Sequence, residues 1–423
     1  MADNFIGAKP SSWVQGTIGA ATPFLLPRFG VVGVDYEPEE LDQLRALAPH
    51  RVLLTPNHPT NIEPALLFHL SRAVRQPFLF MACRESFDQG FGLWGQLIRR
   101  VGAFSVVRGT ADRASMKATR EMLATPRAKM VVFPEGEVYG QNDSLLPFHG
   151  GVFQIAFWTL EDLKKAQIEE PLYILPIALK YRFTRPMERE IEASLARLED
   201  FTGAGDAPPG TASYERLRRI GAAMLQSLER EYRLTPSKDA PNPDDLTPRL
   251  NAVKEAIVTR VASAAGLPTP KGESLPERMR ALIYSVEELT RSDAEPAKGS
   301  PYDAALRRQK AERARPLLHD LRRLANWVAV YDGYVREETT PERMAETLIR
   351  LERECWGKAT LSGPRRCRVR VGSPLDLRDK WADYEKNKRG TVAQVADEIE
   401  SRVAALLGAS AASSVSEASV EKL

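Results

Sequence analysis

The sequence predicts an α/β protein with a mixed sheet flanked by helices and a large all-helical region inserted into it. Three observations support this prediction. Short apolar runs alternate with helix-like segments between residues 51 and 181, strand-like runs almost disappear between residues 185 and 361, and a strand pattern returns at residues 366–371. Because this last strand follows a long helical block, we expect the helices to interrupt the α/β domain.

Apolar runs bounded by turn residues predict the strands of a largely parallel sheet. These runs are residues 51–55, 78–82, 104–107, 129–133 and 172–179. The segments between them have the length and spacing of helices, at residues 64–74, 93–99, 112–124 and 151–163. Asp112 is a suitable N-cap for the third of these helices.

The sequence as a whole predicts five regions. Residues 1–44 form an N-terminal segment, 45–184 the core, 185–361 the helical insertion, 362–407 the last strand and helix of the core, and 408–423 a disordered tail. The insertion shows apolar residues at helical spacing, as at Leu217, Ile220, Met224 and Leu228. Its predicted helices are separated by linkers rich in proline, glycine and aspartate.

Composition excludes several classes of protein. The 423 residues carry a net charge of only +3, which argues against a dedicated nucleic-acid binder. Three scattered cysteines without a CxxC pair favour a reducing compartment over a disulfide framework. No cluster of His, Cys and carboxylate residues predicts a metal site, so we expect none. The N-terminus lacks the basic region and apolar run of a signal peptide.

The most apolar stretch lies at residues 13–34 and is a poor candidate for a membrane span. It contains Pro23, Pro27 and Arg28, whereas a spanning helix needs about 20 mostly apolar residues. Its aromatic and leucine side chains suit either a membrane interface or packing on the protein's own core. We therefore expect a cytoplasmic protein, peripheral to the inner face of the membrane, with no transmembrane helix.

His58 has the most suggestive context of the five histidines. It directly follows a predicted strand and precedes a predicted helix, and the carboxyl ends of such strands form the ligand crevice of open α/β sheets. Pro59 and Pro64 stiffen this loop, so that Glu63 could orient His58 as a general base. The alternative is an exposed histidine beside a glutamate that favours the helix dipole.

Three further segments follow or occupy strands. Arg108 could present a bidentate fork to a phosphate or carboxylate, although strand-terminal arginines commonly form surface ion pairs. Glu135 and Gly136 could contact a polar ligand, or simply form a tight turn. Pro176 inside a strand indicates an edge, a bulge or a site.

Taken together, these segments resemble the glycerolipid acyltransferase family, which includes 1-acyl-glycerol-3-phosphate and lysophospholipid acyltransferases. The resemblance rests on their order: NHPTNIE at residues 57–63, GAFSVVR at 102–108, FPEG at 133–136 and LPIAL at 175–179. LPFHGG at 146–151 and VGSP at 371–374 add weaker matches. It covers residues 45–184 and 362–407.

The resemblance implies an acyltransferase that moves a fatty acyl group from acyl-CoA or acyl carrier protein to a hydroxyl of a lipid acceptor. His58 would be the general base and Glu63 would orient it, and no cofactor other than the acyl donor is implied. The acceptor implied is a lysophospholipid, with 1-acyl-glycerol-3-phosphate as the best candidate, in phospholipid biosynthesis. The substrate-binding residues implied are Asn57, Phe104, Arg108, Pro134, Glu135, Gly136 and Pro176.

Two departures from the family pattern keep alternatives open. Glu63 stands where the family usually has aspartate, so this sequence has an HX4E motif whose acidic side chain is one methylene longer. Catalytic groups must be placed precisely, so the loop would have to compensate for this extra length. Glu137 follows the third motif where many members with phosphorylated acceptors have Thr-Arg-Ser. These departures leave open a non-phosphorylated acceptor, or a non-catalytic lipid-binding protein that retains the fold.

Overall fold

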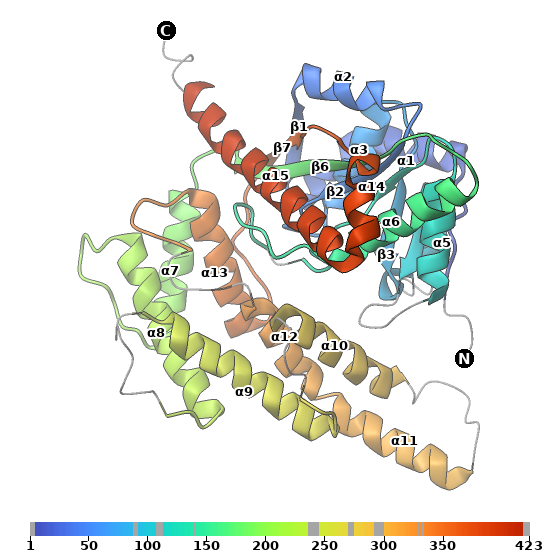
Figure 1. Ribbon diagram of the computed structural model, residues 1–423. Helices are drawn as coiled ribbons and strands as arrows, with labels where there is room; N and C mark the ends of the chain where they lie inside the picture. Colours follow the sequence, from blue (N-terminus) through green and yellow to red (C-terminus); the bar gives the residue numbers. More distant parts are fainter. Residues whose placement is uncertain are drawn as a thin grey trace. The chain divides into compact units, whose positions relative to one another are not determined.

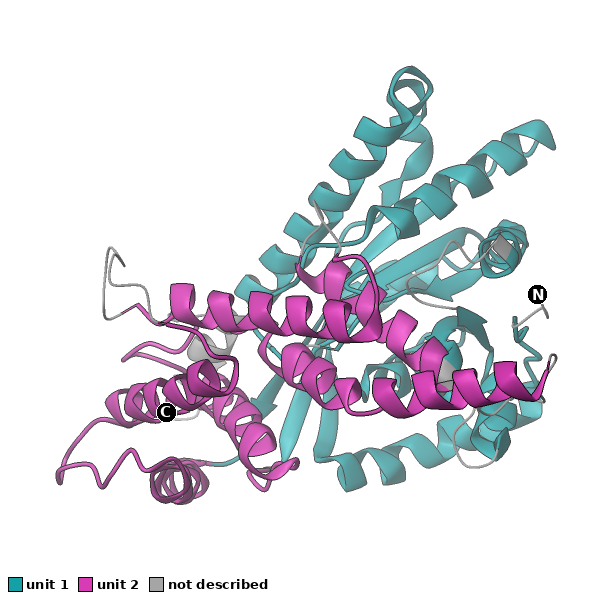
Figure 2. Ribbon diagram, turned by 90° about the horizontal axis from the view of Figure 1, so that it is seen from below, with its two compact units in different colours: residues 1–107, 111–185, 363–423 teal, residues 108–110, 186–362 magenta. Residues whose placement is uncertain are grey.

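The computed structural model describes residues 5–87, 92–106, 113–138, 140–235, 245–269, 275–291, 300–328, 330 and 334–417. The chain divides into two compact units, coloured separately in Figure 2. Unit 1 comprises residues 1–107, 111–185 and 363–423, and unit 2 comprises residues 108–110 and 186–362.

Unit 1 is built on a mixed sheet of eight strands, as the sequence predicts. The strand order is β1-β7-β6-β2-β5-β3-β4, with β8 paired to β6. Strands β6, β2, β5, β3 and β4 run parallel, whereas β7 and β8 are antiparallel to β6. The strands are β1 (Val31–Tyr36), β2 (Arg51–Pro56), β3 (Leu79–Cys83), β4 (Ala103–Val106), β5 (Lys129–Val131), β6 (Leu172–Phe183), β7 (Arg365–Val371) and β8 (Leu375–Asp376).

Helices cover both faces of this sheet (Figure 1). Successive strand residues point to opposite faces, so that Leu54 packs with Leu66 of α3 while Leu53 packs with Phe153 of α6. The core on the α3 side also includes residues from α2, and the opposite core includes residues from α5, α14 and α15. The helices of unit 1 are α1 (Ser12–Leu25), α2 (Pro38–Ala46), α3 (Glu63–Ala73), α4 (Leu93–Val101), α5 (Arg113–Ala124), α6 (Gly150–Lys165), α14 (Trp381–Lys386) and α15 (Lys388–Glu417).

Pro176 occupies the middle of β6 without disrupting the sheet. Its carbonyl accepts a hydrogen bond from the backbone N–H of Gly372, which lies between the end of β7 and the start of β8. The N–H that proline lacks would face the same side, where Pro176 falls in the gap between the residues of β6 that pair with β8 and those that pair with β7. A Cβ on Gly372 would lie 2.9 Å from Pro176 Cγ, so the glycine is needed for this close approach.

Two terminal elements differ from the sequence analysis. Strand β1 is not predicted there, because most of its residues, VVGVDY, belong to the apolar stretch at residues 13–34 that is interpreted as one N-terminal segment. Helix α15 begins before residue 392 and continues to Glu417, into the predicted disordered tail. The alanines of that tail have the highest intrinsic helix propensity.

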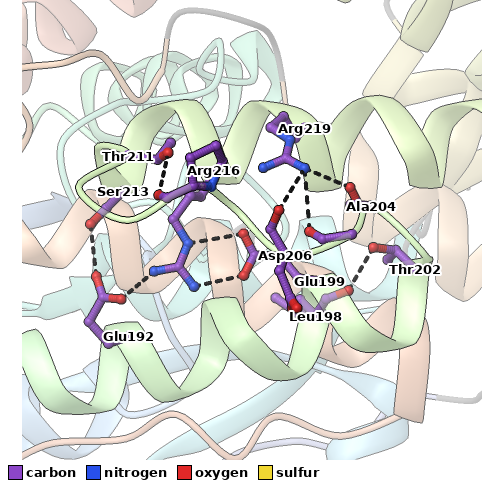
Figure 3. Close-up of polar contacts among 12 residues, drawn as sticks. Glu192, Leu198, Glu199, Thr202, Ala204, Asp206, Thr211, Ser213, Arg216 and Arg219 are labelled. Atoms are coloured by element: carbon purple, nitrogen blue, oxygen red, sulfur yellow. Dashed lines mark hydrogen bonds and ion pairs between the residues drawn. The ribbon is translucent and has the colours of Figure 1, made fainter.

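Within its described residues, the regular secondary structure of unit 2 consists of helices joined by turns and loops. Its helices are α7 (Glu188–Thr202), α8 (Ser213–Glu231), α9 (Thr247–Ala265), α10 (Leu275–Arg291), α11 (Pro301–Ala314), α12 (Leu317–Trp327) and α13 (Pro341–Trp356). Ion pairs as well as apolar packing connect neighbouring helices. Arg216 of α8 donates two hydrogen bonds to Glu199 of α7, at 2.9 and 2.7 Å, and also pairs with Glu192 (Figure 3).

Candidate active site

The candidate site lies where β2 and β5 end. Leu54 of β2 pairs with Val131 of β5 in a parallel register, so the loops that follow the two strands leave the same edge of the sheet. The first loop carries His58 and the second carries Glu135. The carboxyl ends of parallel strands are where open α/β sheets place their ligands.

His58 and Glu63 form a direct pair. Nδ1 of the imidazole lies 2.8 Å from Oε2 of Glu63, whose side chain is completely buried at the first residue of α3. A carboxylate accepts only, so Nδ1 carries a proton, and in the neutral imidazole this leaves the lone pair on Nε2. Nε2 has no hydrogen-bond partner among the described residues, and the His58 side chain remains 15% exposed.

The second carboxylate oxygen of Glu63 is held by residues that the sequence analysis does not identify. Oε1 accepts hydrogen bonds from the Thr60 hydroxyl at 2.5 Å, the Thr60 backbone N–H at 3.1 Å and the Tyr181 hydroxyl at 2.5 Å. Thr60 lies within the NHPTNIE motif and could have been considered from the sequence. Tyr181 lies on β6, and no local signal links it to residue 63.

Phe133 forms one wall beside His58. The two rings are stacked, with centroids 3.9 Å apart and an interplanar angle of 18°. Phe133 directly precedes the predicted FPEG turn residues Pro134 and Glu135, so the end of β5 places its ring against the histidine. The stacking restricts rotation of the imidazole about its axis.

Glu135 ties the loops together. One carboxylate oxygen accepts the backbone N–H of His58 at 2.7 Å, and the other accepts the backbone N–H of Leu146 at 2.9 Å. Burial raises the pKa of Glu135 to about 7, because the charged form is poorly solvated there, although both backbone hydrogen bonds oppose this shift. Through its two hydrogen bonds, the side chain holds the loop that carries His58 against the loop that follows β5.

Asn57 and Asn142 extend the pairing of β6. Asn57 donates to the carbonyl of Leu179 at 3.0 Å and accepts its N–H at 2.7 Å. Asn142 bonds in the same two-sided manner to Tyr181, at 2.8 and 2.7 Å. Both amides replace a neighbouring strand beyond the end of β2, which pairs only as far as Ile177.

Residues 36–180 match the family model described as Acyltransferase. This part of the chain is an acyltransferase domain of the glycerolipid acyltransferase family. The protein is therefore an acyltransferase enzyme, as the resemblance implies. No curated protein matches the chain.

The acyltransferase domain contains the four segments on which the resemblance rests. Each of these segments lies in a different structural setting. Pro134 and Gly136 lie in a tight turn closed by a hydrogen bond from the N–H of Gly136 to the carbonyl of Phe133. Gly136 has a φ of 73°, which favours glycine. Pro134 also accepts the backbone N–H of His149, which begins α6.

Three predicted substrate-binding residues are not joined to His58 by any described contact. Phe104 is completely buried in the core on the α6 side, on β4, which β5 and β3 separate from β2. Pro176 pairs with Thr55 inside the sheet. Arg108 lies outside the described residues, so its predicted role as an anion-binding residue stays a prediction.

His69 is another histidine of unit 1 with a hydrogen-bonded side chain, and it lies outside the His58–Glu63 pair. His69 bonds through Nδ1 to the Tyr36 hydroxyl at 2.6 Å, away from the His58 pair, and burial lowers its pKa. Within the described ranges, no group of three or more His, Cys, Asp or Glu residues could hold a metal ion. None of the described helices combines the length and apolar character needed to cross a membrane.

Proposed function

We propose that the protein transfers a fatty acyl group from an acyl thioester to a hydroxyl of a lipid acceptor, with 1-acyl-glycerol-3-phosphate as the best candidate. The observation that carries this proposal is the His58–Glu63 pair, which leaves Nε2 of His58 as a base with no described partner. A buried carboxylate on Nδ1 stabilises the imidazolium that forms when Nε2 takes a proton.

The proposed reaction needs no covalent enzyme intermediate. His58 Nε2 removes the proton of the acceptor hydroxyl while the oxygen attacks the thioester carbonyl carbon. A C–O bond forms, the C–S bond breaks, and the thiol sulfur takes the proton back from the imidazolium. The acyl donor is acyl-CoA or an acylated carrier protein, and no other cofactor takes part.

The acceptor separates the main proposal from its alternative. A phosphorylated acceptor depends on Arg108, because a guanidinium can bind phosphate through two parallel hydrogen bonds. Glu135 accepts the backbone N–H of His58, and Glu137 follows it by two residues, where many family members with phosphorylated acceptors have Thr-Arg-Ser. This favours a non-phosphorylated hydroxyl as the second candidate acceptor. A non-catalytic lipid-binding protein would have no use for a poised base.

We also propose that α1 and α4 place the enzyme on a membrane surface. Trp13 is 78% exposed and Phe24 81% exposed on α1, and Leu93 is 76% exposed on α4. Apolar side chains of this size are costly in water and suit the interfacial region of a bilayer. A lipid acceptor resides in that region, so peripheral binding brings the enzyme to its substrate.

Thiol release from palmitoyl-CoA, with and without 1-acyl-glycerol-3-phosphate, tests the proposal. We expect release that requires the acceptor and is lost in His58→Ala. His69→Ala is the matched control, because His69 is also hydrogen-bonded in unit 1 but lies outside the pair. Release in folded His58→Ala equal to the wild type would refute His58 as the base. Release that monoacylglycerol supports and the phosphorylated lipid does not would establish the alternative acceptor.

A further inference from the structure

Glu63 is held at both ends of its carboxylate. Oε2 is hydrogen-bonded to Nδ1 of His58. Oε1 accepts hydrogen bonds from the Tyr181 hydroxyl and from the hydroxyl and backbone N–H of Thr60. The Thr60 hydroxyl also accepts the backbone N–H of Ile62 at 3.2 Å, which leaves its proton directed to the carboxylate. Four short polar contacts on a completely buried carboxylate leave it little rotational freedom.

We propose that Tyr181, itself held by Asn142, is a positioning residue that fixes Glu63 against Nδ1 of His58, and that glutamate at this position reaches both partners where aspartate would not. The inference rests on the proposed function, in which His58 is the base. Tyr181 touches neither the imidazole nor the reacting atoms in the proposed scheme. It acts only through Glu63.

The reach of the side chain explains why glutamate fits this position better than aspartate. Tyr181 points to the face of the sheet that α3 covers, and Glu63 is the first residue of α3. An aspartate would withdraw the carboxylate by about 1.5 Å, the length of one C–C bond. Because hydrogen bonds are confined to about 2.5–3.2 Å, an aspartate that met His58 would lose the Tyr181 hydroxyl.

The position of Tyr181 is fixed independently of Glu63. Asn142 bonds both the N–H and the carbonyl of Tyr181. The Arg365 guanidinium lies over the tyrosine ring, 5.0 Å from its centroid. Tyr181 is 1% exposed. A hydroxyl held on a rigid, buried ring is a suitable fixed point for the carboxylate of Glu63.

The first experiment is Tyr181→Phe, assayed by thiol release across a pH series. We expect kcat/KM to fall about 10- to 100-fold, the range for loss of one hydrogen bond to a charged group. Tyr384→Phe is the matched control, since Tyr384 is also completely buried in unit 1 and accepts a hydrogen bond from Gln154. We expect Tyr384→Phe to change kcat/KM less than about twofold.

The second experiment repeats Tyr181→Phe in a protein that already carries Glu63→Asp. In a double-mutant cycle, Tyr181→Phe should have less than about a threefold effect once residue 63 is aspartate, because that contact is already absent. Asn142→Ala should reproduce part of the Tyr181→Phe loss in the wild-type background and little of it in Glu63→Asp. An equal loss from Tyr181→Phe in both backgrounds would overturn the inference, because Tyr181 would then act independently of Glu63.

Ring ¹⁵N and Nδ1–H resonances of histidine give a readout that does not depend on turnover. We expect the His58 signals, assigned with His58→Ala, to shift in Tyr181→Phe and to stay unchanged in Tyr384→Phe. Unchanged His58 signals in folded Tyr181→Phe would overturn the positioning role. Full turnover by His58→Ala would instead refute the proposed function, while the same resonances would still decide whether Tyr181 positions the pair.

Discussion

The carboxylate of Glu135 accepts the backbone N–H of His58 over 2.7 Å. This contact joins the loop after β5 to the loop after β2, and the other oxygen of Glu135 joins the same pair of loops to Leu146. The proposed base is therefore held by its side chain through Glu63 and by its backbone through Glu135. Two carboxylates serve different purposes on one histidine.

The first prediction concerns stability and pH at Glu135. Burial raises the pKa of Glu135 from 4.5 to about 7, so the folded protein binds a proton that the unfolded chain has released. The free energy of unfolding should therefore fall as pH rises from about 4.5 to 7, by at most about 1.4 kcal/mol per pH unit.

Urea denaturation of the wild type and Glu135→Gln across this pH range measures the effect. The glutamine variant should lack this contribution to the slope, because its side chain does not titrate. It should also be less stable by about 1–3 kcal/mol at low pH, since its amide nitrogen faces a backbone donor. Glu121→Gln, an exposed helix position, is the control. Identical pH slopes in all three proteins would contradict the prediction.

The second prediction compares substitutions at Glu63. Glu63→Asp should retain part of the turnover because a carboxylate remains near His58, whereas Glu63→Ala should lose about 100-fold or more, a typical effect of disrupting a general base. Steady-state thiol release measures both, with thermal unfolding as a check of folding. Wild-type turnover in both variants would show that the pair has no part in catalysis.

The third prediction tests Arg108 as a phosphate-binding residue. Arg108→Ala should raise the KM for 1-acyl-glycerol-3-phosphate about tenfold or more, as expected for loss of a charged hydrogen bond. The KM for monoacylglycerol should stay the same, since that acceptor has no phosphate. Arg108→Lys should recover only part of the loss, because an ammonium lacks the planar fork. Equal effects on both acceptors would argue against phosphate recognition.

The fourth prediction concerns membrane binding by α1. Replacing Trp13 and Phe24 with serine should reduce co-sedimentation with vesicles of phosphatidylglycerol and phosphatidylcholine about tenfold or more, because two large apolar side chains lose their burial in the interface. Tyr302→Ser, 74% exposed on α11, is the control at another exposed aromatic residue. Unchanged sedimentation of the double variant would exclude α1 from the membrane contact.

Sequence and structure contribute differently to the His58–Glu63 pair. His58 and Glu63 are five residues apart on one loop and its following helix, so the motif alone predicts their proximity. The family motifs imply that Phe104 and Pro176 bind substrate, and this stays a prediction. The structure places the first in the core and the second within the sheet, and residue spacing alone does not indicate either environment.

By itself the sequence determined the α/β class, the interrupting helices and the residues that form the pair, because hydrophobic periodicity and short motifs are local properties of the chain. Only the tertiary structure decided which distant residues hold Glu63 in place. Tyr181 is 118 residues away along the chain, and Asn142, which holds Tyr181, precedes it by 39 residues. Their contacts exist because parallel pairing of β2 with β6 brings distant segments to one edge of the sheet.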